Sequence, residues 1–373
     1  MIPLSRLLQG GSFPGDSLRF GPRRGSGPVV VWHLTDRCGL RCRHCYAEAT
    51  PEGERFVSLR EGFRCLETFA AWGAPAVLLS GGEPLESPHG RAFLERGAEL
   101  GLSLAVSTNG TRVDDSWAEA LAKRGAYVGV SLDGPQEIHD SFRGVPGAWN
   151  AAAAGLERLK RAGARCGLRV TLCRSTLPGV RDLLEWARGR VDRVCLYHFV
   201  PAGRGQEGEC LSSEQTREVL EWLFSWVRRE AGPLEVLTVD NATDGIALLG
   251  YVKRELPERF GEVRELLARQ GGNQSGLRIL SVRWDGLVSP DPFSFSHPLG
   301  RLDRDTGVLC PEGDLQERLK DRKPYLPPRC ASCPGLPLCN GNLRARASGT
   351  GRGFWGEDPG CYLSGREIRE ILS

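Results

Sequence analysis

The stretch WHLTDRCGLRCRHCYAEA, residues 32–49, places three cysteines within eight positions, directly after an apolar run. They are Cys38, Cys42 and Cys45, and no fourth cysteine stands near them in the sequence. Three thiolates can hold three corners of a 4Fe-4S cluster and leave one iron open for a ligand that is not protein. Zinc also takes cysteine and histidine, so a zinc site completed by His33 or His44 is the alternative. The spacing favours the cluster.

Short apolar runs of strand length alternate with stretches that have helical spacing through the first 200 residues. The predicted strands span 28–34, 76–80, 102–107, 126–132, 166–172 and 193–200. The predicted helices span 58–73, 90–100, 114–124, 147–162 and 179–188. This alternation favours right-handed βαβ units, and hence a parallel sheet that curls into a full or partial barrel. Functional residues of such a sheet lie at the carboxyl ends of the strands.

Polar turns that contain glycine follow three of the predicted strands. Their sequences are SGGEP at 80–84, STNG at 107–110 and SLDG at 131–134. Each turn alone is weak, because glycine turns after strands are common. Together they lie at the same end of consecutive strands, so we expect them to outline one pocket beside the cysteine loop.

Composition limits the classes of partner. The chain has 373 residues, 40% of them hydrophobic, and a formal net charge of +3 without a long basic run, which argues against a nucleic-acid partner. No segment approaches the roughly 20 apolar residues of a membrane span, and the first 20 residues do not resemble a signal peptide. We therefore expect a cytoplasmic protein without membrane partners. Its thirteen cysteines are then metal ligands or buried thiols rather than disulfides.

A second group of cysteines lies near the C-terminus: Cys330, Cys333, Cys339 and Cys361. Four thiolates complete a coordination shell, and their spacing does not separate zinc from an iron-sulfur cluster. The remaining cysteines are interpreted as small buried apolar residues. They are Cys65, Cys166, Cys173, Cys195, Cys210 and Cys310.

The Cys-x3-Cys-x2-Cys motif with His44 before its last cysteine, followed by Gly-Gly-Glu-Pro after the next strand, resembles the radical S-adenosylmethionine (SAM) enzymes. In that family the open iron binds the amino and carboxylate groups of SAM, and an electron from the cluster cleaves SAM to a 5'-deoxyadenosyl radical. The resemblance implies an α/β fold: a partial (β/α)6 barrel, similar to a TIM barrel, with a small C-terminal iron-sulfur auxiliary domain. The expected division is 1–27 as an N-terminal extension, 28–232 as the barrel, 233–298 as a connecting segment with a β-hairpin, and 299–373 as the auxiliary domain.

The family's SAM-binding positions can be carried over to Tyr46, Gly81, Gly82, Glu83, Ser107, Asn109, Ser131, Asp133 and Arg169. Arg169 would neutralise the SAM carboxylate or act as a structural counter-ion, and both alternatives remain open. The C-terminal cysteines resemble an auxiliary 4Fe-4S site. Peptide-modifying relatives often carry a second auxiliary cluster around a hairpin, but here Asp291 stands where a cysteine might be expected. We therefore expect one auxiliary cluster.

The stretches LYHFVPAGRG, VLTVDNATDG and CNGNLRARA narrow the resemblance to the heme-biosynthesis branch. It implies removal of acetate side chains from 12,18-didecarboxysiroheme to give Fe-coproporphyrin III, with ferredoxin or flavodoxin as electron donor. Candidate substrate residues are Arg143, Tyr197, His198, Arg204, Arg344 and Arg346, although each arginine could be structural and His198 could be hydrogen-bonded within the barrel. Alternatives are heme d1 synthesis, decarboxylation of Fe-coproporphyrin III, peptide modification, and a non-catalytic iron-sulfur or zinc protein.

Overall fold

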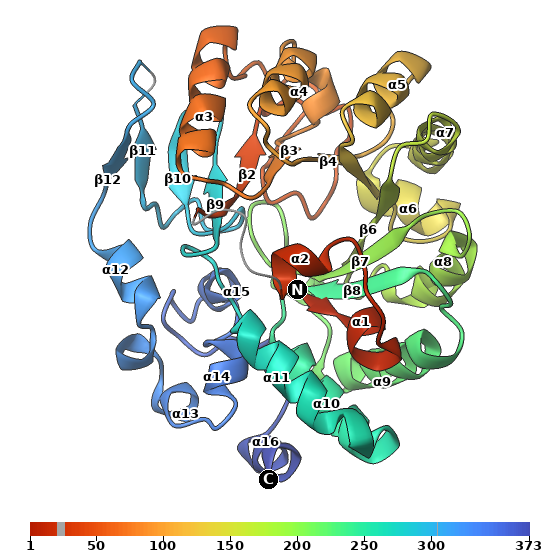
Figure 1. Ribbon diagram of the computed structural model, residues 1–373, viewed down its shortest axis with the longest axis vertical. Coiled ribbons are helices and arrows are strands. Elements are labelled where there is room, and N and C mark those ends of the chain that lie inside the picture. Colours follow the sequence, from red (N-terminus) through yellow and green to blue (C-terminus); the bar gives the residue numbers. More distant parts are fainter. Residues whose placement is uncertain (21–26, 304) are drawn as a thin grey trace.

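The computed structural model describes residues 1–20, 27–303 and 305–373. Its centre is one twelve-stranded sheet with the strand order β1-β8-β7-β6-β5-β4-β3-β2-β9-β10-β11-β12 (Figure 1). The strands are β1 (Ile2–Pro3), β2 (Val29–His33), β3 (Val77–Ser80), β4 (Leu104–Thr108), β5 (Tyr127–Ser131), β6 (Cys166–Leu172), β7 (Arg193–His198), β8 (Glu235–Val239), β9 (Ile279–Val282), β10 (Leu287–Ser289), β11 (Gly300–Leu302) and β12 (Leu309–Pro311). Strands β2 to β8 are mutually parallel, so they form the curled wall of the barrel.

Helices on the outer side of the wall connect the parallel strands (Figure 1). They are α3 (Leu59–Ala71), α4 (Gly90–Glu99), α5 (Asp115–Lys123), α6 (Gln136–Arg143), α7 (Ala148–Arg161), α8 (Val180–Ala187) and α9 (Ser213–Arg229). Helix α3 begins with a capping box, in which Ser58 and Glu61 exchange hydrogen bonds. The six predicted strands and five predicted helices are all present.

The parallel sheet contains a seventh strand, β8, which the sequence prediction missed. The first residue of β8 is Glu235, and an acidic residue is not expected in a buried strand. In the structure, Arg19 and Arg193 pair with this carboxylate inside the barrel, with Arg19 Nη1 2.7 Å from Glu235 Oε1. Strand β1 from the N-terminus pairs antiparallel with β8. The sheet thus runs across the expected boundary at residue 232, and residues 21–26 of the expected extension lie outside the described residues.

The predicted hairpin is present, with β9 and β10 joined by a turn around Trp284 and Gly286. Strand β9 also pairs in parallel with β2, which places the hairpin beside the strand that precedes the cysteine loop. The remaining helices are α1 (Leu4–Gln9), α2 (Asp16–Arg19), α10 (Thr243–Glu255), α11 (Phe260–Gln270), α12 (Leu315–Lys320), α13 (Pro328–Ala331), α14 (Leu336–Cys339), α15 (Arg344–Gly349) and α16 (Gly365–Leu372).

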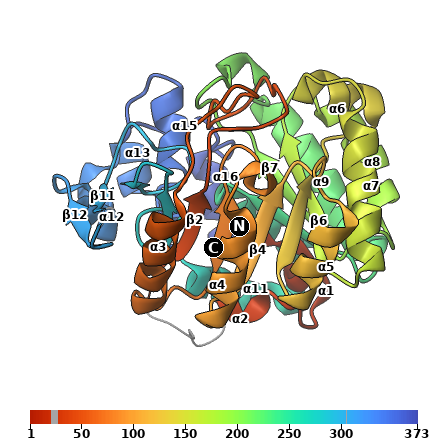
Figure 2. The same ribbon diagram turned by 90° about the horizontal axis from the view of Figure 1, so that it is seen from above.

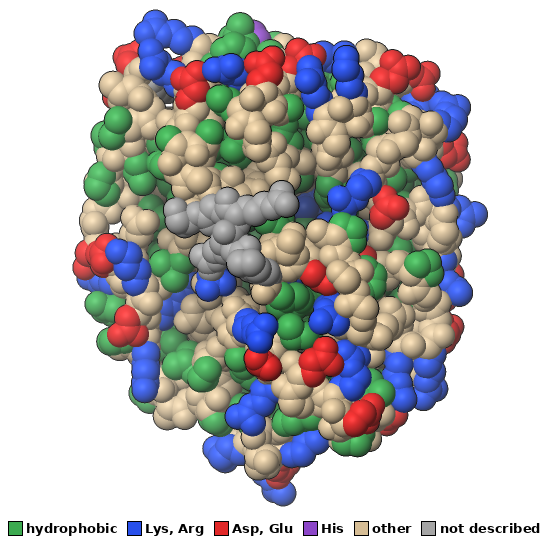
Figure 3. Space-filling view, viewed as in Figure 1, with side chains coloured by type: hydrophobic (Ala, Val, Ile, Leu, Met, Phe, Trp, Pro, Cys, Tyr) green, Lys and Arg blue, Asp and Glu red, His purple; other side chains and the backbone are tan. Residues whose placement is uncertain are grey.

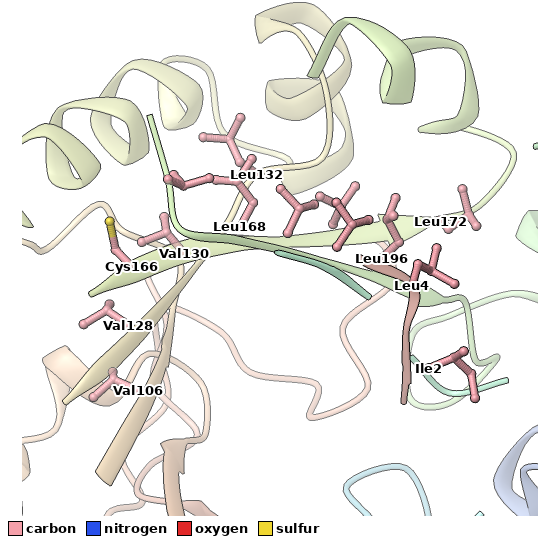
Figure 4. Close-up of a cluster of buried hydrophobic side chains, with 14 of the residues drawn as sticks. Ile2, Leu4, Val106, Val128, Val130, Leu132, Cys166, Leu168, Leu172 and Leu196 are labelled. Atoms are coloured by element: carbon pink, nitrogen blue, oxygen red, sulfur yellow. The ribbon is translucent and has the colours of Figure 1, made fainter. Parts of the chain in front are cut away.

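The main core lies between the sheet and its outer helices. Val106 of β4, Val130 of β5 and Leu168 of β6 are buried on neighbouring strands (Figure 4). Burial of each such side chain stabilises the fold by about 1.5–3 kcal/mol. No helix in the described part of the chain is long and apolar enough to cross a membrane. Acidic and basic side chains are mixed over the face of α1, α2 and α11 (Figure 3).

The carboxyl ends of the parallel strands all lie at one end of the barrel. The loop between β2 and α3 and the loop after β7 meet above this end (Figure 2). The backbone N–H of Arg204, after β7, donates to the carbonyl of Cys45 at 3.1 Å. Gly203, at φ +57°, allows this approach, because a Cβ there would lie 2.5 Å from the same carbonyl oxygen.

Candidate functional site

Cys38, Cys42 and Cys45 line one cavity at the carboxyl end of the barrel. The thiols of Cys38 and Cys42 are buried, and burial raises the pKa of Cys38 to about 12, with the neighbouring Glu83 charge as a further cause. Iron coordination would deprotonate such a thiol. Two donors already point at the sulfurs: Asn109 Nδ2 lies 3.5 Å from the Sγ of Cys38, and Arg143 Nη1 lies 3.8 Å from the Sγ of Cys42. This donor set fits an anionic thiolate cluster.

The zinc alternative required a histidine beside the thiols. His44 lines the same cavity, but its ring stacks on Phe142 of α6, and burial lowers the pKa of His44 to about 3. The His33 ring makes edge contacts with Tyr46 and Phe295, and it does not line the cavity.

A buried ion pair fixes Arg143 beside the cysteine loop. Its Nε and Nη2 lie 2.7 and 2.6 Å from Oδ2 of Asp133. Burial alone would raise the pKa of Asp133, but the Arg143 charge, two neighbouring histidines and the Thr171 N–H together outweigh it, so the pKa is lowered. The Asp133 Oδ1 accepts the backbone N–H of Thr171. Asp133, expected to contact SAM, therefore lies behind the cavity wall, and Arg143, expected to bind substrate, points at Cys42.

The Gly-Gly-Glu-Pro turn packs directly on the cysteine loop. The N–H groups of Gly82 and Glu83 donate to the carbonyls of Thr35 and Arg37, both at 2.7 Å. A Cβ at Gly82 would lie 2.1 Å from the Arg37 oxygen. Glycine is thus required for loop-to-loop contact as well as for the exposed backbone that faces the cavity.

Glu83 joins two of the loops from behind the wall. Its carboxylate accepts hydrogen bonds from the hydroxyl of Thr108 at 2.7 Å and from the N–H groups of Asn109 and Leu85 at 2.7 and 3.2 Å. Burial raises the pKa of Glu83 to about 7, against these three donors. Glu83 does not line the cavity, so the geometry gives it a role in positioning Asn109.

Most of the other predicted site residues do line the cavity. They are Tyr46, Gly81, Gly82, Ser107, Asn109, Ser131, Arg169, Tyr197 and His198. Arg169 lies over the Tyr197 ring, 4.2 Å from its centroid, and its guanidinium donates to the Tyr197 hydroxyl. Gly129 makes this arrangement possible, because a Cβ there would lie 2.8 Å from Arg169 Cδ. The position of Arg169 suits both roles expected for it, as a partner of the SAM carboxylate and as a structural counter-ion.

His198 and Arg204 are both tied to the protein. His198 Nε2 lies 2.8 Å from Oδ2 of the buried Asp244, whose other oxygen accepts from the Tyr362 hydroxyl at 3.0 Å. The guanidinium of Arg204 donates to the carbonyls of Cys42 and Ala49 at 3.1 and 3.0 Å. Arg204 therefore braces the cysteine loop and does not line the cavity.

Asp240 is a cavity residue that the sequence analysis missed. It follows β8 with φ +66°, a left-handed conformation that is rare for a residue other than glycine. It is the sole acidic side chain among the described residues that line the cavity, and burial raises its pKa to about 6. Its only sequence signal was the VDN stretch, which is not informative until β8 is recognised.

The four C-terminal cysteines lie close enough together to interact. Burial raises the pKa of Cys339 to about 12, and the next largest effects that raise it come from Cys361, Cys333 and Cys330. Arg344 is buried beside Cys330 and Cys339 and binds the Gly356 carbonyl, whereas the buried Arg346 binds the Phe199 carbonyl and Asp358. Neither of these two arginines lines the cavity. Of the cysteines expected to be buried, Cys310 is exposed, because β12 is the edge of the sheet.

Comparison with known proteins gives the family. The model of the radical SAM superfamily matches residues 32–187. Fe-coproporphyrin III synthase of Methanosarcina barkeri (strain Fusaro / DSM 804) is 39% identical over 99% of both chains. Pre-heme d1 synthase of Dinoroseobacter shibae is 36% identical over 91% of this chain and 87% of its own. Streptococcus suis SuiB bound to precursor peptide SuiA shares the fold, with a TM-score of 0.68 at 17% identity over 91% of this chain and 76% of that chain. The chain belongs to the radical SAM superfamily.

Proposed function

We propose that the chain removes acetate side chains from 12,18-didecarboxysiroheme and so produces Fe-coproporphyrin III. The observation that carries this proposal is the 39% identity to Fe-coproporphyrin III synthase across 99% of both chains, which includes both groups of cysteines. The similarity to pre-heme d1 synthase supports an iron tetrapyrrole substrate more broadly.

Members of the superfamily bind a 4Fe-4S cluster and SAM, and an electron from the cluster cleaves SAM to a 5'-deoxyadenosyl radical. Cys38, Cys42 and Cys45 would hold the cluster in this chain. Asn109 and Arg143 would donate to its sulfur ligands, which favours an anionic site. The SAM contacts proposed for this chain are Tyr46, Gly81, Gly82, Ser107, Asn109, Ser131 and Arg169, with Glu83 and Asp133 acting through their neighbours.

The tetrapyrrole would bind on the β7 and β8 side of the cavity. Tyr197 and Asp240 line this side, and Phe293, from the loop after β10, lines the same cavity with its ring 5.0 Å from that of Tyr46. Aromatic faces suit a flat macrocycle. Arg169 is the cavity's cation on this side for a substrate carboxylate or for the carboxylate of SAM.

The proposal includes one auxiliary 4Fe-4S cluster on Cys330, Cys333, Cys339 and Cys361. A one-electron carrier protein, such as ferredoxin or flavodoxin, would supply the electrons. The expected location of the chain is the cytoplasm. Asp291, where a second auxiliary cluster might have had a cysteine, is buried and accepts hydrogen bonds from the Ser294 hydroxyl and the Phe293 N–H.

The test is an anaerobic assay of the reconstituted chain with SAM, dithionite and 12,18-didecarboxysiroheme. Mass spectrometry would follow 5'-deoxyadenosine and the tetrapyrrole together. Stepwise loss of two acetate groups, matched by deoxyadenosine, is the expected result. The variant with Cys38, Cys42 and Cys45 all replaced by alanine should form neither product, whereas Cys310→Ala, on the exposed edge strand, should behave as the wild type.

Other outcomes separate the alternatives. Loss of propionate mass would move the chain to heme d1 synthesis, and loss of CO2 from propionates would move it to decarboxylation. Deoxyadenosine with an unchanged tetrapyrrole would point to peptide modification. SAM cleavage by the triple alanine variant would refute the assignment of the three cysteines.

A further inference from the structure

Two arginines are almost completely buried beside the C-terminal cysteines. Arg322 and Arg344 have 2% and 1% of their surface exposed, and their charges act on one another. Burying two like charges together is unfavourable unless negative charge compensates them. A nearby group must therefore supply negative charge to Arg322 and Arg344.

Hydrogen bonds to neutral groups hold Arg322 in place. Its Nη1 donates to Oδ1 of Asn273 at 3.0 Å and to the carbonyl of Asn340 at 3.2 Å, and its Nη2 donates to the carbonyl of Ser275 at 2.7 Å. Its buried Nε has no hydrogen-bond partner among the described residues. None of these acceptors carries a full charge.

Arg344 is held in the same way from the other side. Its guanidinium donates to the carbonyls of Gly356 at 2.6 Å, Phe354 at 3.4 Å and Gly341. Its Nε is also buried and without a hydrogen-bond partner. Arg322 and Arg344 therefore bind the backbone on both sides of one short turn, at Asn340 and Gly341.

The nearby carboxylates do not balance the two charges. Asp358 forms its ion pair with Arg346, whose Nη1 lies 3.0 Å from Oδ2, so it acts on Arg344 only as a neighbouring charge. Asp291 is the remaining acid that acts on Arg322, and its carboxylate accepts hydrogen bonds from the Ser294 hydroxyl and the Phe293 N–H. Neither Arg322 nor Arg344 forms an ion pair with a carboxylate among the described residues, because both guanidinium groups are held by carbonyl and amide oxygens.

The turn that Arg322 and Arg344 hold directly follows Cys339 in the sequence. Asn340, Gly341 and Asn342 have φ values of 52°, 75° and 55°, a run of left-handed residues that costs free energy at both asparagines. The Gly341 N–H donates to the Cys339 sulfur. Both arginines interact electrostatically with the Cys339 thiol, and Arg344 also with that of Cys330. The missing negative charge belongs where these sulfurs meet.

We propose that Arg322 and Arg344 are the built-in counter-charge of an anionic 4Fe-4S cluster on Cys330, Cys333, Cys339 and Cys361, and that they raise its reduction potential. This inference rests on the auxiliary cluster included in the proposed function. Reduction adds one electron from an external donor, and no bond forms or breaks. The added negative charge interacts favourably with the two fixed guanidinium groups, which makes reduction easier.

The experiment is a potentiometric titration of the reconstituted full-length protein, read by electron paramagnetic resonance with dithionite as reductant. The triple alanine variant of the first three cysteines identifies the signal of the auxiliary cluster. Arg322→Gln and Arg344→Gln should each lower the equilibrium constant for reduction about tenfold, which is a midpoint shift of about 59 mV to more negative potential. Arg366→Gln, an exposed arginine of α16, is the matched control and should leave the midpoint unchanged.

Lysine variants separate the effect of the positive charge from the effect of the arginine's shape and hydrogen bonds. Arg322→Lys and Arg344→Lys should keep the cluster and a midpoint near that of the wild type, even where a glutamine variant loses its iron. Cluster loss in the lysine variants too would overturn the inference, since shape rather than charge would then be needed. An unmoved midpoint in loaded glutamine variants would also overturn it, as would zinc without iron in the wild type. All readouts omit the tetrapyrrole, so failure here is distinct from failure of the proposed reaction.

Discussion

The imidazole ring of His44 lies flat against the phenyl ring of Phe142, with centroids 4.0 Å apart and planes within 5°. This contact joins the cysteine loop to the last turn of α6. The N–H of Arg43 also donates to the Phe142 carbonyl, and that of Arg41 to the Arg143 carbonyl, so α6 supports the loop through both ring and backbone.

We expect Phe142→Ala to loosen the cysteine loop. Truncation of a buried phenylalanine costs about 3–5 kcal/mol of unfolding free energy, and here it also removes the surface on which His44 rests. Iron and sulfide content after anaerobic reconstitution, together with thermal unfolding, would measure the effect. Phe142→Leu keeps the apolar volume and should retain more iron. Equal iron content in the wild type and the alanine variant would contradict the role of this contact.

The ion pair of Asp133 and Arg143 can be tested by a double-mutant cycle. Arg143→Gln leaves a buried carboxylate unpaired and should cost about 3–5 kcal/mol, whereas the double variant with Asp133→Asn should recover part of that loss. Urea unfolding of the four proteins gives the coupling energy. Additive losses would show that the two side chains act independently.

Gly82→Ala should separate the glycine turn from the cysteine loop. The new Cβ would lie 2.1 Å from the Arg37 carbonyl oxygen, and overpacking of this kind costs about 1–3 kcal/mol. We expect weaker SAM binding in isothermal titration calorimetry. Gly261→Ala is the matched control, because its Cβ would meet no atom within 4 Å and Gly261 lies in the first turn of α11. Unchanged SAM affinity in Gly82→Ala would count against the close contact.

Asp240 makes stability depend on pH in a defined direction. Burial raises the pKa of Asp240 from 3.8 to about 6. Between these two pH values the Asp240 carboxyl is protonated in the folded protein and ionised in the unfolded chain. Its contribution is fully favourable below about pH 4 and is lost as the pH rises through 6. Asp240→Asn should therefore gain about 1–2 kcal/mol relative to the wild type between pH 5 and pH 7.5, measured by urea unfolding. A constant difference across this range would disprove the proton uptake.

The strands with clear apolar periodicity could be predicted from the sequence, and those with a polar interruption could not. Strand β8 was missed because Glu235 is buried only through its arginine partners, which come from distant parts of the chain. Helix α6 was missed because QEIHDSFR has only Ile138 and Phe142 as large apolar residues, and it buries His139 and Arg143 instead.

The site shows a similar limit. Spacing identified the cysteine loop and the turns that meet it, because these depend on local sequence. It did not show which way a carboxylate points: Glu83 and Asp133 turn away from the cavity toward backbone donors, and Asp240 turns in. The direction in which a carboxylate side chain points depends on contacts between neighbouring loops, and the local sequence does not encode these contacts.

The strand order has a consequence for association between copies of the chain. The twelve-stranded sheet ends in β1, with two residues, and in β12, with three. A longer unpaired edge would offer a row of free N–H and C=O groups to another strand and promote aggregation. Such short terminal strands leave little room for edge-to-edge pairing, which protects a wide, largely parallel sheet during folding and at high concentration.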